Sequence, residues 1–202
     1  MDALLLTAVT LIACWVLKDR QQQHRIALLA SFLARHSIEK NMETVTQGYL
    51  RALGEADPVR QEQVWGVLRQ SEQELCSQVE RLARDFASTD TALARVSLFP
   101  MWMPFAARLF PSFDLRDALA IHARGIRRAI ELGPATPARE RAFAISAEVF
   151  LLQHTCHWFC RTKLVASARM LARHQTSYEQ LVASVLPRTR SEYLALVRRT
   201  PA

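Results

Sequence analysis

Residues 154–160 read HTCHWFC and place two histidines and two cysteines within seven positions. Imidazole nitrogens and thiolates are the ligands that zinc prefers, and histidine is also an axial ligand of haem iron. At 100° per residue the four side chains of one helix cannot all face a single ion. A site would therefore need help from a neighbouring helix, which makes His122, His154 and His157 the candidate ligands. The more specific signals of a metal site, paired CxxC units or HExxH, are absent from the sequence.

The helix that carries these residues favours a structural role instead. Residues 142–160 contain a single formal charge, Glu148, and are apolar nearly all round. Such a helix belongs at the centre of a bundle, where buried cysteines behave as small hydrophobic side chains. We expect Glu148 to pair with Arg127 or Arg128, and the helix to run from Pro137 to about Arg173. This interpretation predicts no cofactor and no metal.

The composition predicts an all-α fold. Only five glycines occur in 202 residues, and long stretches consist of Ala, Leu, Arg, Gln and Glu, which are good helix formers. The Gly-rich nucleotide loops and the GxSxG motif of common enzyme classes are missing. Binding is therefore favoured over catalysis, and a helical enzyme or a metal- or haem-binding protein using the buried histidines is the alternative.

The amino-terminal run Ala3–Leu17 has no charge and no helix breaker. Its fifteen residues cover roughly 22 Å as a helix, against a hydrocarbon core of about 30 Å. With snorkelling of Lys18 to extend its reach, the run predicts a single-pass membrane anchor. Lys18, Arg20 and Arg25 all follow the run, so the positive-inside rule places residues 18–202 in the cytoplasm of a bacterium, at the inner membrane.

Two other interpretations of this run stay open. Residues 11–14, LIAC, resemble the lipobox of bacterial lipoproteins, which would place a lipid on Cys14. The apolar run continues through residues 15–17 beyond that cleavage point, and no basic residue precedes it. The third interpretation is a helix buried in the core of the protein.

The pattern of apolar residues divides the remaining chain. Residues 18–53 and 58–87 each carry a helical stripe, and they are separated by Gly54, Asp57 and Pro58, which suit a helix end, an N-cap and a first helical turn. Two such helices should pack antiparallel and return the chain close to its starting level. The predicted architecture is an N-terminal membrane-anchor helix (1–17) that continues into a long antiparallel helical hairpin (18–96), followed by a compact helical bundle (97–202).

The segment 97–113, SLFPMWMPFAARLFPSF, is apolar, holds three prolines and carries Arg108 as its only charge. If the chain returns to the bilayer, Trp102 could lie near the lipid headgroups. Alternatively, the segment could fill a gap between helices. A lipid- or partner-binding surface is predicted from Trp102 and Arg108 together with the basic cluster on the following helix. That cluster consists of Arg124, Arg127 and Arg128.

Charge is unevenly distributed along the chain, whose formal net charge is +7. Lys/Arg and Asp/Glu number 11 and 12 in residues 1–100, but 15 and 7 in residues 101–202. A basic half suggests an anionic surface or an acidic protein as partner. Nucleic acid is disfavoured, because the joint at 133–137 contains two prolines and leads into an apolar helix, not a base-reading one. We therefore predict a membrane-anchored helical binding protein, an adaptor or assembly factor for a membrane complex.

Overall fold

The computed structural model describes residues 2–133 and 135–198 and confirms the all-α class. The helices in this part of the chain are α1 (Asp2–Leu33), α2 (Ile38–Gly54), α3 (Pro58–Phe86), α4 (Thr91–Ala94), α5 (Ala106–Leu109), α6 (Leu115–Ile130), α7 (Ala138–Cys160), α8 (Lys163–His174), α9 (Tyr178–Ser184) and α10 (Pro187–Val197). Two short strands, β1 (Arg95–Ser97) and β2 (Ser112–Asp114), pair antiparallel with Val96 opposite Phe113.

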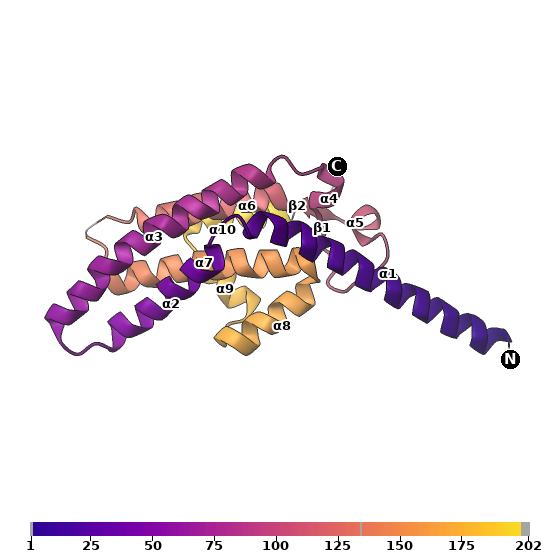
Figure 1. Ribbon diagram of the computed structural model, residues 1–202, viewed down its shortest axis with the longest axis horizontal. Helices are drawn as coiled ribbons and strands as arrows, with labels where there is room; N and C mark the ends of the chain where they lie inside the picture. The colour runs from indigo at the N-terminus through magenta and orange to yellow at the C-terminus, as the bar shows by residue number, and fades with distance from the viewer. Residues whose placement is uncertain (1, 134, 199–202) are drawn as a thin grey trace.

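The molecule is elongated, with α1 projecting from one end and the α2–α3 turn forming the other (Figure 1). Helix α7 lies along the middle and packs against α1, α2, α6, α8 and α9. Its side chains Ile145, Leu151 and Phe159 are fully buried, as a helix with apolar residues nearly all round requires. The prediction that this helix belongs at the bundle centre is confirmed.

Local sequence signals set several helix starts. The Asp57 side chain accepts a hydrogen bond from the Val59 amide, and Pro58 occupies the first turn of α3. The Asp114 carboxylate likewise accepts from the Arg116 amide at the start of α6. The predicted turn between α2 and α3 and their mutual packing are confirmed.

Two predicted helices are interrupted. The helix expected over residues 18–53 breaks at residues 34–37, so α1 and α2 are separate. The helix expected to reach Arg173 ends at Cys160, and Thr162 starts α8 by accepting a hydrogen bond from the Val165 amide. No proline or glycine marks either break in the sequence.

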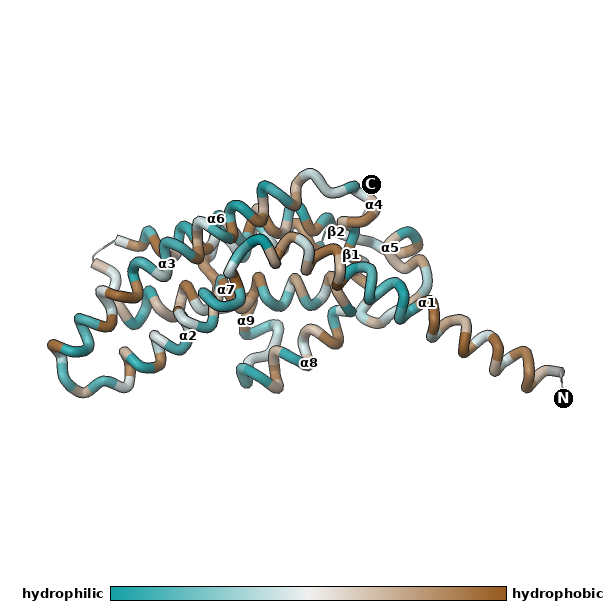
Figure 2. Tube along the Cα trace, viewed as in Figure 1, coloured by the Kyte–Doolittle hydropathy of each residue, from teal (hydrophilic) through white to brown (hydrophobic). Residues whose placement is uncertain are grey.

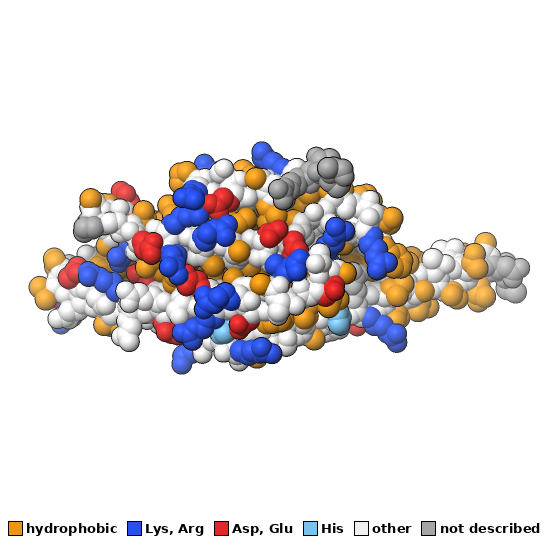
Figure 3. All heavy atoms as spheres, turned by 90° about the horizontal axis from the view of Figure 1, so that it is seen from above, with side chains coloured by type: hydrophobic (Ala, Val, Ile, Leu, Met, Phe, Trp, Pro, Cys, Tyr) orange, Lys and Arg blue, Asp and Glu red, His pale blue; other side chains and the backbone are white. Residues whose placement is uncertain are grey.

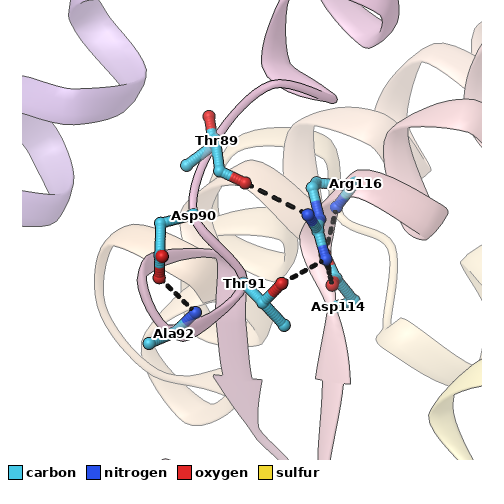
Figure 4. A network of polar contacts seen from close by, with 6 residues as sticks. All are labelled: Thr89, Asp90, Thr91, Ala92, Asp114 and Arg116. Atoms are coloured by element: carbon cyan, nitrogen blue, oxygen red, sulfur yellow. Dashed lines mark hydrogen bonds and ion pairs between the residues drawn. The ribbon is translucent and has the colours of Figure 1, made fainter.

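The connector between α3 and α6 is fixed by one guanidinium group. Arg116 pairs with the Asp114 carboxylate at 2.6 Å and donates to the carbonyl of Thr89 at 3.1 Å and the hydroxyl of Thr91 at 2.9 Å (Figure 4). Asp90 caps α4 through the Ala92 amide. These bonds hold the β1–β2 pair beside α6. The segment 97–113, which connects the two strands, therefore has both of its ends fixed.

The membrane-anchor prediction is contradicted. Among the helices of residues 2–133 and 135–198, none has both the length and the apolarity needed to cross a membrane. The uncharged run has fifteen residues and is followed at once by Lys18, Asp19 and Arg20, whereas a span needs about twenty apolar residues. The single-pass anchor and the inner-membrane location deduced from it are therefore corrected.

Candidate binding surfaces

The first half of α1 carries apolar side chains that the protein itself does not cover. Leu4 is 80% exposed and Trp15 is 67% exposed, and the segment extends beyond the folded body (Figure 2). The other large apolar side chains exposed here are Leu5, Leu6, Val9, Leu11, Ile12 and Leu17. This exposure excludes the interpretation of the run as a helix buried in the protein core. Residues 3–17 are called the apolar projection below.

The second half of α1 is held firmly against the body. The Arg25 guanidinium donates to the carbonyls of Phe159 at 3.0 Å and Arg95 at 2.9 Å. Arg161 donates to the side chain of Gln22. These contacts tie α1 to α7 and β1, so the apolar projection starts from a fixed base.

The 97–113 segment lies at that base, as the return of the chain through α3 predicts. The Trp102 indole N–H donates to the side-chain oxygen of Gln21 at 3.0 Å. Met101, Phe105 and Leu109 are exposed, whereas Trp102 itself is half-buried. Figure 3 shows hydrophobic side chains on the projecting helix and where it joins the body, with acidic and basic side chains intermixed elsewhere on the visible face.

The predicted basic cluster is neutralised by acidic partners. Arg124 and Arg128 both pair with Glu192, at 3.0 and 2.8 Å, and Arg127 pairs with Glu80. Phosphate groups would have to compete with these carboxylates. The three arginines therefore pair with side chains of α3 and α10, whereas Trp102 is hydrogen-bonded to α1. Arg108 is exposed and forms no ion pair within the described residues.

The pair predicted between Glu148 and Arg127 or Arg128 does not form. Glu148 is fully buried, and one of its carboxylate oxygens accepts the Leu186 amide at 3.0 Å. Its second oxygen has no hydrogen-bond partner within the described residues. Burial raises the pKa of this carboxyl to about 7.

The three candidate histidine ligands bind separate partners. The His122 Nε2 lies 2.9 Å from the Thr155 hydroxyl, and the His154 Nε2 lies 3.1 Å from the Ser167 hydroxyl. His157 lies on another face of α7, where its Nδ1 is 3.4 Å from the Arg169 guanidinium group. Within residues 2–133 and 135–198, no three His, Cys, Asp or Glu side chains come together as a metal site would require. Burial lowers the pKa of His122 to about 3 and that of His154 to about 4, which keeps both rings neutral.

The HTCHWFC segment divides into two faces of α7. His154, Thr155, Trp158 and Phe159 point into the core, and the Trp158 indole donates to the Ser97 carbonyl. Cys156, His157 and Cys160, which follow one helical face, line an open groove instead. Burial raises the pKa of Cys156 to about 12 and that of Cys160 to about 11. Both thiols stay protonated near neutral pH, which disfavours a role as nucleophile.

The groove has a volume of about 870 Å³ and runs along α7. One side is formed by the end of α1 and the start of α2, and the other by α8. Its apolar lining includes Leu33, Met42, Phe150 and Leu152. This surface was not predicted from the sequence, although the spacing of residues 153, 156, 157 and 160 is that of one helical face.

The two sides of the groove carry opposite charge. On α2, Glu39 and Glu43 lie one turn apart and Lys40 also lines the groove, so this side has two carboxylates against one ammonium group; on α8, Arg169 and Arg173 lie one turn apart. The two glutamates and the two arginines are exposed, and none of these four forms an ion pair within the described residues. The groove therefore combines an apolar floor with a net acidic edge on α2, which also holds Lys40, and a guanidinium edge on α8.

No protein-family model, curated protein sequence or solved structure matches this chain. The apolar projection and the groove are the two surfaces of the molecule that point to a function.

Proposed function

We propose that this protein is a helical adaptor or assembly factor that binds a protein partner through the apolar projection. The observation that carries the proposal is the exposure of eight large apolar side chains on residues 3–17, whereas the rest of α1 is held firmly against the body. Contiguous exposed apolar surface of this kind is typical of an interaction site. The body packs its own core without the projection, so folding alone gives no reason for that segment.

The distribution of the apolar side chains favours a partner that encloses the helix. Leu4, Leu5 and Leu6 are consecutive and therefore point in three directions 100° apart. A helix that lies in a lipid interface needs one polar face, which this segment lacks. A groove or bundle formed by partner helices covers such a segment on several sides, as in helix-in-groove recognition.

The proposal predicts that polar substitutions in the projection dissociate a defined complex. After lysis of the host cells under native conditions, the variant Leu5→Gln/Ile12→Gln should have the native mass of a single chain, 23.0 kDa. The unaltered protein should run in a heavier complex with one identified partner at a fixed ratio. Native mass measurement and peptide identification of the partner provide the readout.

Val67→Gln is the matched control, because Val67 is 73% exposed on α3 and lies outside the projection. This variant should retain the complex. The proposal is wrong if all three proteins have the same native mass, or if lipid alone accompanies the unaltered chain.

A further inference from the structure

The groove along α7 is a second surface, and the proposed role of the apolar projection does not account for it. Its floor uses residues 150–160 of α7, which rise about 15 Å at ~1.5 Å per residue. That distance corresponds to about three turns of a helix. The groove thus follows α7 and is flanked by helices that pack against it.

The charged side chains on its edges repeat with the period of a helix. Glu39 and Glu43 on one edge, and Arg169 and Arg173 on the other, are each separated by four residues. A helix lying along the groove presents side chains at the same spacing, so each edge can form two successive ion pairs with it. None of the four groups is in an ion pair in the described part of the chain, so a bound helix would displace only two neutral contacts: the Gln47 side chain donates to Glu43 at 3.0 Å, and Arg169 lies 3.4 Å from the His157 Nδ1.

The opposite charge of the two edges distinguishes a helix from a small amphiphile. An anionic amphiphile such as a fatty acid could pair with Arg169 and Arg173, but it would leave Glu39 and Glu43 unpaired beside its own negative charge. A helix that carries carboxylates along one edge and ammonium groups along the other complements the two arginines and the two glutamates, which outnumber Lys40 on the α2 side. Its apolar stripe would cover the floor, which includes Leu33, Met42 and Phe150.

We propose that this groove binds an amphipathic helix of a protein partner, with its acidic edge on Arg169 and Arg173 and its basic edge on Glu39 and Glu43. Recognition follows the helix-in-groove mode, in which the apolar stripe supplies affinity and the charged edges supply specificity. The proposal does not depend on the role of the apolar projection. Together the two surfaces give the chain two docking sites, as an adaptor requires.

The probe is a fluorescent fourteen-residue peptide, stapled on its outer face to keep it helical. It carries a leucine stripe with glutamates on one edge and lysines on the other. The comparison peptide has the same composition, with both charges alternating on both edges. Anisotropy titrations with the full-length protein should show at least tenfold tighter binding of the segregated peptide. Equal binding of the two peptides would overturn the proposal.

Charge reversal in the groove provides the second arm. The variant Arg169→Glu/Arg173→Glu should weaken binding of the segregated peptide at least tenfold, and a peptide with lysines on both edges should bind the variant better than the unaltered protein. Arg51→Glu is the matched control, because Arg51 is also exposed in the last turn of its helix and lies outside the groove. It should leave binding unchanged.

Oleate is titrated in parallel to test for an anionic amphiphile. The proposal fails if Arg169→Glu/Arg173→Glu weakens oleate binding while the segregated peptide and the comparison peptide bind with equal affinity. That result would show that the groove binds an anionic amphiphile. The variant Leu5→Gln/Ile12→Gln should keep full affinity for the segregated peptide, which separates this result from the outcome for the apolar projection.

Discussion

Replacement of Glu72 by alanine is expected to lower the free energy of unfolding by about 3–5 kcal/mol, because it breaks a buried charged network. Glu72 is only 1% exposed and accepts the Tyr49 hydroxyl at 2.8 Å. Its second oxygen lies 3.6 Å from the Arg141 guanidinium. The three residues join α2, α3 and α7, and alanine leaves a largely buried cation and a buried hydroxyl without their partner.

Urea unfolding followed by circular dichroism measures this loss. Glu62→Ala is the control on the same helix, because Glu62 forms an exposed pair with Arg69 at 3.0 Å. Exposed pairs contribute little to stability, so this variant should unfold close to the unaltered protein. Similar losses in the free energy of unfolding for both variants would show that Glu72 does not hold α2, α3 and α7 together.

The second large effect is a pH dependence centred on Glu148. Its pKa is raised to about 7 by burial, against an ordinary value of 4.5. The folded protein therefore holds this proton over a range in which the unfolded chain has released it. The stabilising contribution is fully present below about pH 4.5, is lost as the pH rises through about 7, and stays lost above it. At 1.36 kcal/mol per pH unit, the difference between 4.5 and about 7 corresponds to a total loss of about 3 kcal/mol.

Glu148→Gln isolates this contribution, because the amide oxygen can still accept the Leu186 N–H but carries no charge. Between pH 5 and pH 8 the stability of the variant relative to the unaltered protein should rise by about 2 kcal/mol. His122 and His154, with lowered pKa values, make both proteins less stable as the pH falls below about 6.5, and this common effect cancels in the comparison. Parallel stability curves for the two proteins would contradict the assignment.

The glycine opposite this carboxyl group explains how Glu148 is accommodated. A Cβ atom at Gly125 on α6 would collide with the Glu148 carboxylate and the Thr189 hydroxyl. Helices α6, α7 and α10 therefore approach closely only because residue 125 has no side chain. The sequence shows the glycine inside a helical pattern, but only the assembled fold shows what it faces.

Sequence patterns predicted the helices well where their signals are local. Asp57 with Pro58 marked a helix start that the structure confirms. The break at residues 34–37 was missed because a distant contact accompanies it: the His36 ring lies 3.1 Å from the Asp85 carboxylate on α3. Such a contact joins residues 49 positions apart, and no local propensity encodes it.

The candidate sites were harder to predict for the same reason. Arg124 and Arg127 looked available for anionic partners, because Glu192 and Glu80 are 68 and 47 residues away along the chain. The HTCHWFC segment was correctly placed in the bundle centre, but the groove on its other face depends on α2 and α8. The apolar run of residues 3–17 is evident in the sequence. Its exposure, and the fixed position of the part of α1 that follows it, depend on where α1 packs against α7.

Photo-crosslinking at Ile12 tests the central claim, that the apolar projection is covered by a protein partner, most directly. A photoreactive amino acid in place of Ile12 in the full-length protein, illuminated in its host cells, should give a discrete adduct with one protein, identified by its peptides. The same photoreactive residue at Val67, which is also well exposed, should not give that adduct. Adducts with lipid alone at Ile12, or the same protein adducts at both positions, would contradict the claim.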